Sequence, residues 1–321
     1  MAYYFGGELE NAVNAYETAF SLDSRLPAEA HYNLGVAYHE LARYLDAIRE
    51  YEMVLKIEPT HSNATNNLGL VLSLLGEKER AIDMFNQVLK LDPKNMKALI
   101  NLGNVFLNSK EFSKAEQIYL QAISVNEKEI SPKLNLGVVY FEKGEFEKAK
   151  TEWDKALSSD PKNIRILSVM GSAYLEKKLY EDAIKVFREM VNLMPKNGEI
   201  ANTLGYLLAE RNQDLDYAKE LIERALDLDQ PNRATYFDSL AWVHFRKGAY
   251  EKAREVQEKA LKIFKLTHEP ISSEVHFHMG RIYEKLLDKK AAAKSYSYAL
   301  ESDSDPDSVR MASESLSLLT K

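Results

Sequence analysis

The chain has 321 residues, a net charge of −7 and no cysteine. Basic and acidic residues are mixed along its whole length, which argues against nucleic acid or an anionic membrane as partner, because both need a clustered basic face. Disulfides, thiolate catalysis and Cys-ligated zinc are excluded, while the cytoplasm and the periplasm stay equally open. The longest apolar run, LGLVLSLLG, is too short to span a bilayer, so we expect a soluble chain without direct membrane insertion.

The sequence Asn-Leu-Gly recurs at a spacing of 34 residues, beginning at Asn33, Asn67, Asn101 and Asn135. A fixed period predicts an array in which each unit packs on its neighbours. Within a unit, apolar or small residues recur at spacings of three and four on two separate faces, which predicts two short amphipathic helices. Because polar or glycine-containing turns separate these helices, each unit is predicted to be a helical hairpin.

Residues 1–27 fit the second half of a unit, so we expect the chain to begin inside a longer natural protein. Repeats are then predicted at 28–61, 62–95, 96–129, 130–163, 164–197 and 198–232. After an irregular junction, the segment 233–306 is predicted to contain repeats at 234–267 and 273–306, and a capping helix is predicted at 307–321. An extra residue in RNQDLDYA predicts a distorted turn in the unit 198–232. The insertion at 268–272 is the expected place of a bend or hinge.

The order Leu-Gly, Tyr, Ala, aromatic residue, Ala and Pro resembles the tetratricopeptide repeat. In the unit 130–163 it comprises Leu136, Gly137, Tyr140, Gly144, Ala149, Trp153, Ala156 and Pro161. The resemblance implies an all-α fold, an α-solenoid with about eight full repeats, a partial N-terminal repeat and a C-terminal cap, or about 18 helices in a right-handed superhelix. Departures from the pattern include Ile222 and Gln257, which stand in the aromatic place of their units.

The asparagine before each Leu-Gly pair occupies a place that, by the resemblance, faces the concave groove. Asparagine is a mediocre helix residue, so four in register suggest a compensating use. The four are Asn33, Asn67, Asn101 and Asn135, and Asn66, Asn104 and Asn108 add amides to the same stretch. Their amides could bind the backbone of an extended peptide, or each could bond the neighbouring repeat and hold the superhelix. The ladder is similar to the asparagine-lined superhelix of the protein O-linked N-acetylglucosamine transferases, although nothing here resembles their catalytic domain.

The ladder ends after Asn135, and the inner face of the later units offers aromatic residues beside arginine instead. This is the composition of binding hot spots. The candidates are Tyr206, Trp242, Phe245, Arg246, Phe277 and Arg281. Any single aromatic among them could equally belong to the core. Our hypothesis is a groove with two parts, one that reads peptide backbone and one that is more selective.

Signals for metal binding and catalysis are weak. His276 and His278 are two residues apart and lack the spacing of four that a zinc helix needs, so they are interpreted as structural. A calcium loop beginning at Asp303 would need glycine where Ser308 stands, and the acidic run is better interpreted as the N-terminal cap of a helix. No Gly-rich phosphate loop appears. We therefore predict no cofactor, no metal site and no enzyme activity.

The clamp with which some tetratricopeptide repeats hold a chaperone C-terminus is not expected, because Glu29, Tyr32 and Val36 stand at the relevant places. The sequence thus predicts a protein-interaction scaffold of bacterial type that holds a peptide in its concave face. An oligomerisation module that docks through Tyr3, Tyr4 and Phe5 or through the convex face is a second hypothesis. A regulatory arm of a larger protein is a third. The partner's identity does not follow from the sequence.

Overall fold

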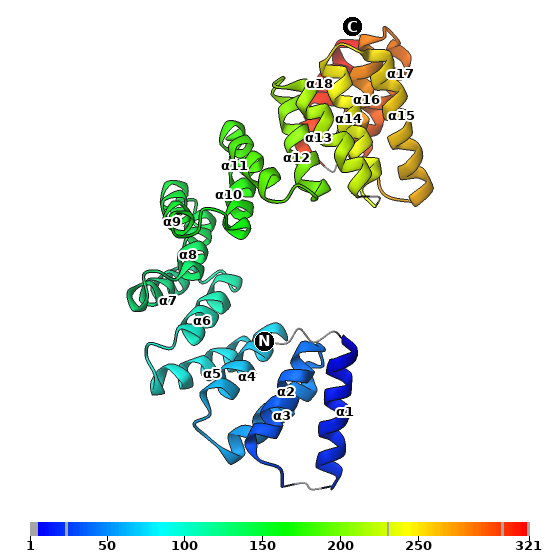
Figure 1. Ribbon diagram of the computed structural model, residues 1–321. Helices are drawn as coiled ribbons and strands as arrows, with labels where there is room; N and C mark the ends of the chain where they lie inside the picture. The colour runs from blue at the N-terminus through cyan, green and yellow to red at the C-terminus, as the bar shows by residue number, and fades with distance from the viewer. Residues whose placement is uncertain (1–5, 23–24, 230, 303–304, 320–321) are drawn as a thin grey trace. The chain divides into compact units, whose positions relative to one another are not determined.

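The computed structural model describes residues 6–22, 25–229, 231–302 and 305–319, and these form eighteen α-helices and no strand (Figure 1). Helix α1 (Gly6–Leu22) is the predicted half-unit and α18 (Pro306–Leu319) the predicted cap. Eight hairpins lie between them. They are α2 (Ala28–Glu40) with α3 (Tyr44–Ile57), α4 (Ser62–Leu74) with α5 (Lys78–Leu91), α6 (Met96–Asn108) with α7 (Phe112–Val125), α8 (Ile130–Glu142) with α9 (Phe146–Ser159), α10 (Ile164–Glu176) with α11 (Tyr180–Leu193), α12 (Gly198–Glu210) with α13 (Leu215–Leu228), α14 (Arg233–Arg246) with α15 (Tyr250–Thr267), and α16 (Ser273–Lys285) with α17 (Lys289–Ser302).

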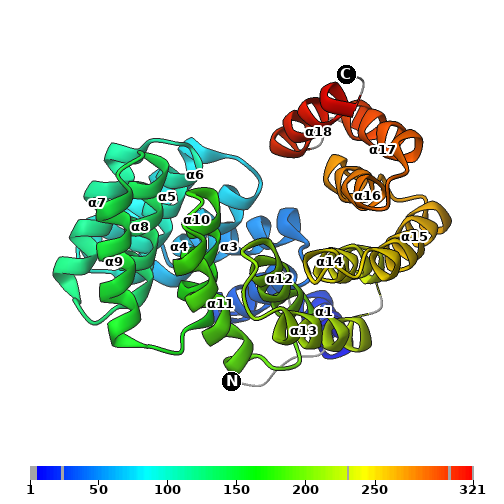
Figure 2. The same cartoon turned by 90° about the horizontal axis from the view of Figure 1, so that it is seen from above.

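The chain divides into two compact units, which we call unit 1 (Met1–Pro161) and unit 2 (Lys162–Lys321). Unit 1 contains α1 to α9, and unit 2 contains α10 to α18. In both units the two helices of a hairpin pack on each other and the second helix packs on the next hairpin. Figure 2 shows this stacking for the hairpins α6–α7 and α8–α9. The all-helical solenoid predicted from the repeat period is thereby confirmed.

The conserved-looking glycine of the pattern allows the close approach of the two helices in a hairpin. A Cβ atom added to Gly103 would lie 2.5 Å from the ring of Tyr119, which is fully buried. In the sixth repeat, Ile222 stands in the aromatic place, and a Cβ on Gly205 would lie 2.6 Å from its side chain. Any larger residue at these positions must therefore displace the core.

The turn inside each hairpin uses a left-handed residue. Ala42, Lys110 and Lys178 have φ values of 55°, 58° and 57°, and Gly76 has the same hand with φ 80°. The turn at 211–214 differs because both Asn212 and Asp214 have positive φ. The extra residue in this repeat does distort its turn.

The hinge predicted at 268–272 lies inside unit 2. Helix α15 ends at Thr267, and His268 follows it with a φ of 58°. Helix α16 begins at Ser273, and the Ser272 side chain caps it by accepting a hydrogen bond from the Val275 amide. Movement at this place stays a prediction. Among the described residues, no helix has the length and apolarity needed to cross a membrane.

Candidate functional site

The asparagine ladder of unit 1 is used mainly between repeats. Asn67 Nδ2 donates to Tyr32 Oη at 3.3 Å, and Asn101 Nδ2 donates to Asn66 Oδ1 at 3.3 Å. In each pair the acceptor is the residue just before the ladder position of the preceding repeat. Asn135 has the apolar Ile100 at that place, and donates instead to Asn104 Oδ1 at 2.8 Å. Three of the four ladder amides thus bond the neighbouring repeat.

The remaining predicted amides are placed differently. Asn104 Oδ1 also accepts from Tyr119 Oη at 2.6 Å, so its carbonyl oxygen has two donors. Asn33 is half-buried and Asn108 is exposed, and neither side chain makes a hydrogen bond within the part of the chain that the structure describes. The carbonyl oxygens of Asn67 and Asn101 receive no donor from the described residues either. These acceptors are the part of the ladder that could still meet a peptide.

The same inter-repeat relation returns in unit 2 with charged groups. His278 occupies the ladder position of its repeat, and its Nδ1 lies 3.1 Å from Asp238 Oδ2, just before the ladder position of the preceding repeat. Both side chains are buried. Gln257 Nε2 donates to Asp238 Oδ1 at 2.5 Å, which explains why a polar residue stands in the aromatic place here. Asp238 and Gln257 belong to this network, and the sequence interpretation did not connect them.

The surroundings of His278 favour its protonated form. Burial by itself lowers the pKa of an imidazole, but the adjacent Asp238 carboxylate, with Glu274 and Glu210 further away, raises the pKa of His278 to about 9. The indole of Trp242 stacks on this ring at 4.1 Å between centroids and 19° between planes, an arrangement suited to a cation. His278 is therefore an imidazolium at neutral pH.

Two further carboxylates beside this pair are held by hydrogen bonds. Tyr206 Oη donates to Glu274 Oε1 at 2.5 Å, and Trp242 Nε1 donates to Glu210. Burial raises the pKa of Glu274, and burial together with the charge of Glu274 raises the pKa of Tyr206 well above 10. The polar groups around His278 are thus bonded to each other.

A pocket of about 660 Å³ opens beside this network in unit 2. All six residues predicted for the second half of the groove line it, although they come from α12, α14 and α16. The lining is completed by the turn before α11 and by α18. The lining residues are Lys178, Tyr180, Tyr206, Leu207, Glu210, Arg211, Trp242, Phe245, Arg246, Glu274, Phe277, His278, Arg281, Asp305, Asp307, Ser308, Arg310 and Met311.

The aromatic residues of the pocket form its floor. Trp242 and Phe245 stack at 4.6 Å between centroids, and both, like Phe277, are less than 10% exposed. Tyr180 and Tyr206 are half-buried. Most of the surface of the Trp242, Phe245 and Phe277 rings is therefore buried by packing within unit 2. The rest of the lining consists mostly of charged side chains.

Residues at the start of the capping helix line the pocket. Lys178 Nζ, in the turn of the first hairpin of unit 2, lies 2.6 Å from Asp307 Oδ2 at the start of α18. Asp305 caps the same helix, because its Oδ2 accepts from the Ser308 amide at 2.8 Å. The predicted N-terminal cap is thus present. Asp303 lies outside the described residues, and among those described no cluster of His, Asp and Glu is arranged to hold a metal ion.

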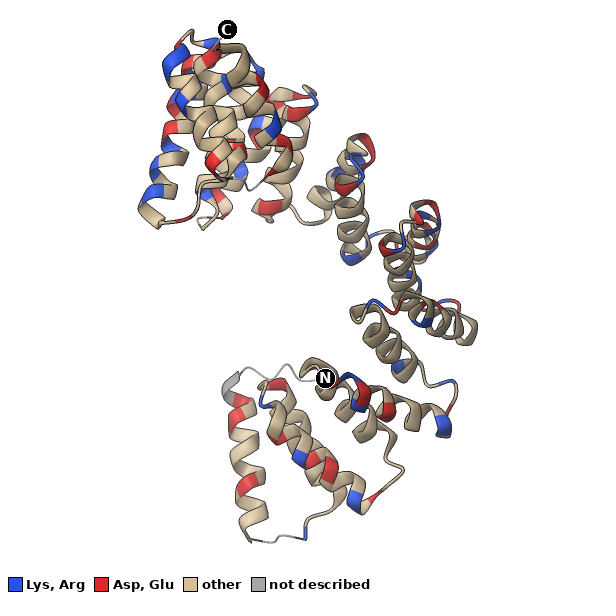
Figure 3. Cartoon of the chain, turned by 180° about the vertical axis from the view of Figure 1, so that it is seen from behind, with Lys and Arg blue, Asp and Glu red and all other residues tan. Residues whose placement is uncertain are grey.

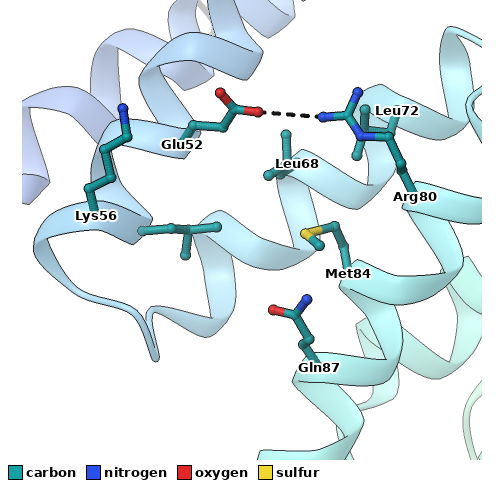
Figure 4. Close-up of a pocket in the computed structure, with 8 residues that line it drawn as sticks. Glu52, Lys56, Leu68, Leu72, Arg80, Met84 and Gln87 are labelled. Atoms are coloured by element: carbon teal, nitrogen blue, oxygen red, sulfur yellow. Dashed lines mark hydrogen bonds and ion pairs between the residues drawn. The ribbon is translucent and has the colours of Figure 1, made fainter.

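Neither the distribution of charge nor the other pocket indicates a further binding site. Lys and Arg are mixed with Asp and Glu on most helices of both units, whereas the charged residues of α1 are all acidic (Figure 3). A second pocket of about 350 Å³ lies in unit 1, with Leu68 and Leu72 as its apolar base and an ion pair of 3.4 Å between Glu52 and Arg80 at its edge (Figure 4). Its remaining lining is Leu55, Lys56, Met84 and Gln87. Neither feature coincides with a predicted site.

Comparison with known families agrees with the hairpin geometry. Five sequence families described as tetratricopeptide repeats match residues 26–94, 2–41 with 137–178, 74–131, 206–265 and 164–197. The chain belongs to the tetratricopeptide repeat family. Proteins of this family are typically non-catalytic scaffolds that bind other proteins or peptides. The family assignment therefore supports a role in protein interaction and leaves the binding residues open.

Several solved structures are similar to this tetratricopeptide repeat chain. MamA is 28% identical, with a TM-score of 0.45 over 51% of this chain and 95% of that one. A tetratricopeptide repeat protein from Parabacteroides merdae is 16% identical (TM-score 0.46, 92% and 99% covered), and PilF of Pseudomonas aeruginosa is 22% identical (TM-score 0.49, 68% and 97% covered). Because these scores are below 0.5, the similarities say nothing about what this chain binds.

Proposed function

We propose that this tetratricopeptide repeat protein is a non-catalytic scaffold that binds a polypeptide segment of a partner protein in the pocket of unit 2. The observation that carries the proposal is the convergence of six residues, named from the sequence as a binding surface, on one pocket. Its volume lies in the range of about 300 to 1,000 Å³ that suits ligand binding. Arg246 in its wall has no partner among the described residues, so a ligand could engage it without breaking an internal bond.

The asparagine ladder is not part of the proposed site. Because Asn67, Asn101 and Asn135 donate to neighbouring repeats, their side chains are held in place before any ligand arrives. Their carbonyl oxygens lie in unit 1, and none of the three residues lines the pocket of unit 2. The alternative of self-association through Tyr3, Tyr4 and Phe5 falls on residues outside those described, and it stays a prediction.

A displayed library of random peptides, selected on the purified chain, provides the test. An enriched peptide would be titrated calorimetrically against the native chain and against Arg246→Trp, which fills the pocket without removing an internal bond. We expect affinity to fall by at least about tenfold, as for the centre of an interface. The matched control is Arg254→Trp on the outer helix α15, where Arg254 is exposed, and this variant should bind like the native chain.

A variant with alanine at all four ladder positions, Asn33, Asn67, Asn101 and Asn135, should bind an enriched peptide like the native chain, because none of the four lines the pocket of unit 2. Circular dichroism checks that each variant folds, and Arg281→Trp replaces Arg246→Trp if the latter does not. The proposal is wrong if no peptide is enriched, or if peptides bind the pocket-filled variants as well as they bind the native chain.

A further inference from the structure

We propose that the pocket of unit 2 selects an acidic segment, in which Asp or Glu side chains of the bound peptide pair with Arg246 and Arg281. This inference rests on the proposed function and adds the chemistry of the ligand. It follows from which polar groups of the pocket already have hydrogen-bond partners in the protein and which do not. The pocket is lined by both signs, so a count of charges alone does not decide the question.

The four carboxylates of the lining are all engaged. Glu210 accepts from Trp242 and Glu274 accepts from Tyr206. Asp305 caps α18, and Asp307 pairs with Lys178 and, at 3.7 Å, with Arg310. A basic ligand would have to compete with these internal donors for each carboxylate.

The arginines of α14 and α16 are less satisfied. Arg246 is half-buried at the last position of α14, and the structure gives it no hydrogen bond or ion pair within the described residues. Arg281 Nε lies 3.6 Å from Glu284 Oε2, but this nitrogen is buried without a hydrogen-bond partner. Buried donors without acceptors are costly, and a carboxylate satisfies a guanidinium with two parallel bonds. Both arginines therefore favour a ligand that brings carboxylates.

The imidazolium of His278 strengthens the same preference. Its charge is balanced by Asp238, which lies behind it and does not line the pocket, so the positive partner is the one that faces the ligand. Most other cations of the lining are likewise paired: Lys178 with Asp307, Arg310 with Asp307 and Glu314, Arg211 with Glu181 and Arg281 with Glu284. Among the described residues, Arg246 is therefore the charged side chain of the lining that has neither an ion pair nor a hydrogen bond.

An acidic peptide fits these features better than nucleic acid does. A nucleic acid carries a charge at every nucleotide and needs a long basic track, whereas the basic groups here are confined to one pocket and interspersed with acidic side chains. A peptide can present one or two carboxylates to the arginines and place neutral residues beside Glu210 and Asp307. Single-stranded oligonucleotide serves as a competitor in the test.

The test repeats the peptide selection on three forms of the full chain, namely native, Arg246→Glu and Arg254→Glu. Peptides selected on the native chain and on Arg254→Glu should be enriched in Asp and Glu, whereas those selected on Arg246→Glu should shift toward Lys and Arg. A native-selected peptide should lose about tenfold in affinity for Arg246→Gln, as expected for a desolvated charge pair at an interface. It should lose a similar factor when its acidic residues are replaced by Gln or Asn.

The outcomes separate this inference from the proposed function. Enriched peptides that are neutral or basic on the native chain, or an unchanged composition on Arg246→Glu, would refute the acidic preference while leaving peptide binding intact. Displacement of the peptide by the oligonucleotide at comparable concentration would also refute it. Absence of any enrichment would refute both proposals. Arg281→Gln is the second variant should Arg246→Glu fail to fold.

Discussion

Both units link neighbouring repeats through the same pair of positions, but unit 1 uses neutral side chains there and unit 2 uses charged ones. In unit 1 the ladder residue of one repeat donates to the residue before the ladder position of the preceding repeat, as in Asn101 to Asn66 at 3.3 Å. In unit 2 the equivalent pair is His278 and Asp238 at 3.1 Å. Neutral amides need little support, whereas a buried ion pair needs further hydrogen bonds to offset the cost of desolvation. Gln257 supplies one of these to Asp238, and the indole of Trp242 covers His278.

The comparison shows that two departures from the repeat pattern can have one cause, a shared hydrogen-bond partner. Gln257 in the aromatic place and His278 in the ladder place look like separate lapses in the sequence, but both bond to Asp238. The network lies beside the unit 2 pocket, to whose lining it contributes His278. Unit 1 keeps the regular pattern, and the links at its ladder positions are neutral.

The largest effect is expected from breaking the charged pair. Asp238→Ala leaves the imidazolium of His278 and the amide of Gln257 without their acceptor, and should lower the free energy of unfolding of unit 2 by about 3 to 5 kcal/mol. Asn66→Ala, the matched change in unit 1, should cost only about 1 kcal/mol because a single neutral hydrogen bond is lost. Urea unfolding measures both, with Trp242 as the reporter of unit 2 in a Trp153→Phe background and Trp153 as the reporter of unit 1 in a Trp242→Phe background.

A double variant sharpens this result. Asp238→Asn with His278→Asn rebuilds in unit 2 the amide pair of unit 1. It should recover most of the stability that Asp238→Ala loses, since no buried charge is left without a partner. A double variant as unstable as Asp238→Ala would show that the two pairs are not equivalent.

The next effect concerns pH. The pKa of His278 is raised in the folded chain to about 9 from an ordinary 6.5, so its contribution to stability is complete below about pH 6.5 and is lost as the pH rises through about 9. The whole contribution of this pKa difference to the free energy of unfolding is about 3 kcal/mol, at 1.36 kcal/mol per pKa unit. Asp238, Glu274 and Glu210 are the acidic groups that raise this pKa. Unfolding of unit 2 should therefore become easier between pH 7 and 9, and unit 1 should change much less over the same interval.

The matched measurement uses the double variant with asparagine at 238 and 278, which lacks the titrating ring. Its unit 2 should lose the dependence between pH 7 and 9. If the native chain were equally stable at both pH values, the ion pair would not carry the stability assigned to it.

A smaller effect, common to both units, is expected at the helix contacts. Gly103→Ala in unit 1 and Gly205→Ala in unit 2 should each cost about 1 to 3 kcal/mol, because the added Cβ overlaps the Tyr119 ring or the Ile222 side chain. Thermal unfolding followed by circular dichroism gives the loss. An equal effect in both units would confirm that they share the hairpin packing while differing in the links between hairpins.

The smallest effect is a gain in stability. Leu287 is 87% exposed and has φ 63°, a conformation that costs a residue with a Cβ about 1 to 2 kcal/mol relative to glycine. Leu287→Gly should thus stabilise unit 2 by about 1 kcal/mol after the entropy cost of glycine in the unfolded chain. The equivalent turn of the fourth repeat already contains Gly144 with φ 77°, and Gly144→Leu should be correspondingly destabilising.

The hairpins could be predicted from the sequence because their core positions recur at a fixed spacing. Gly103 and Tyr119 must stand 16 residues apart wherever two such helices cross, and the same interval separates Gly280 from Tyr296. The hydrogen bonds between repeats were harder to predict. They join residues in different hairpins, and whether an asparagine finds an acceptor depends on one residue 35 places earlier, such as Tyr32 for Asn67 or Ile100 for Asn135.

The sequence interpretation grouped the candidate residues that line the pocket, but it did not contain their individual contacts. Tyr206 and Arg281 follow the glycine of the pattern, and Trp242 follows Ala241 at the equivalent position, so that all three lie on one side of successive inner helices. The extent to which Trp242 is covered by Phe245 and His278 depends on side-chain packing that periodicity does not contain. Glu274 and Asp238 were missed because their partners lie 68 and 40 residues away.

The central claim is that a peptide binds in the pocket of unit 2, and photo-crosslinking tests it most directly. A selected peptide carrying a benzophenone side chain would be irradiated with the native chain, and the attached residues identified by mass spectrometry. Binding in the pocket predicts crosslinks to α12, α14, α16 and α18, which a tenfold excess of unlabelled peptide suppresses. Suppressible crosslinks confined to α4, α6 and α8 would place the peptide on the asparagine ladder and contradict the claim.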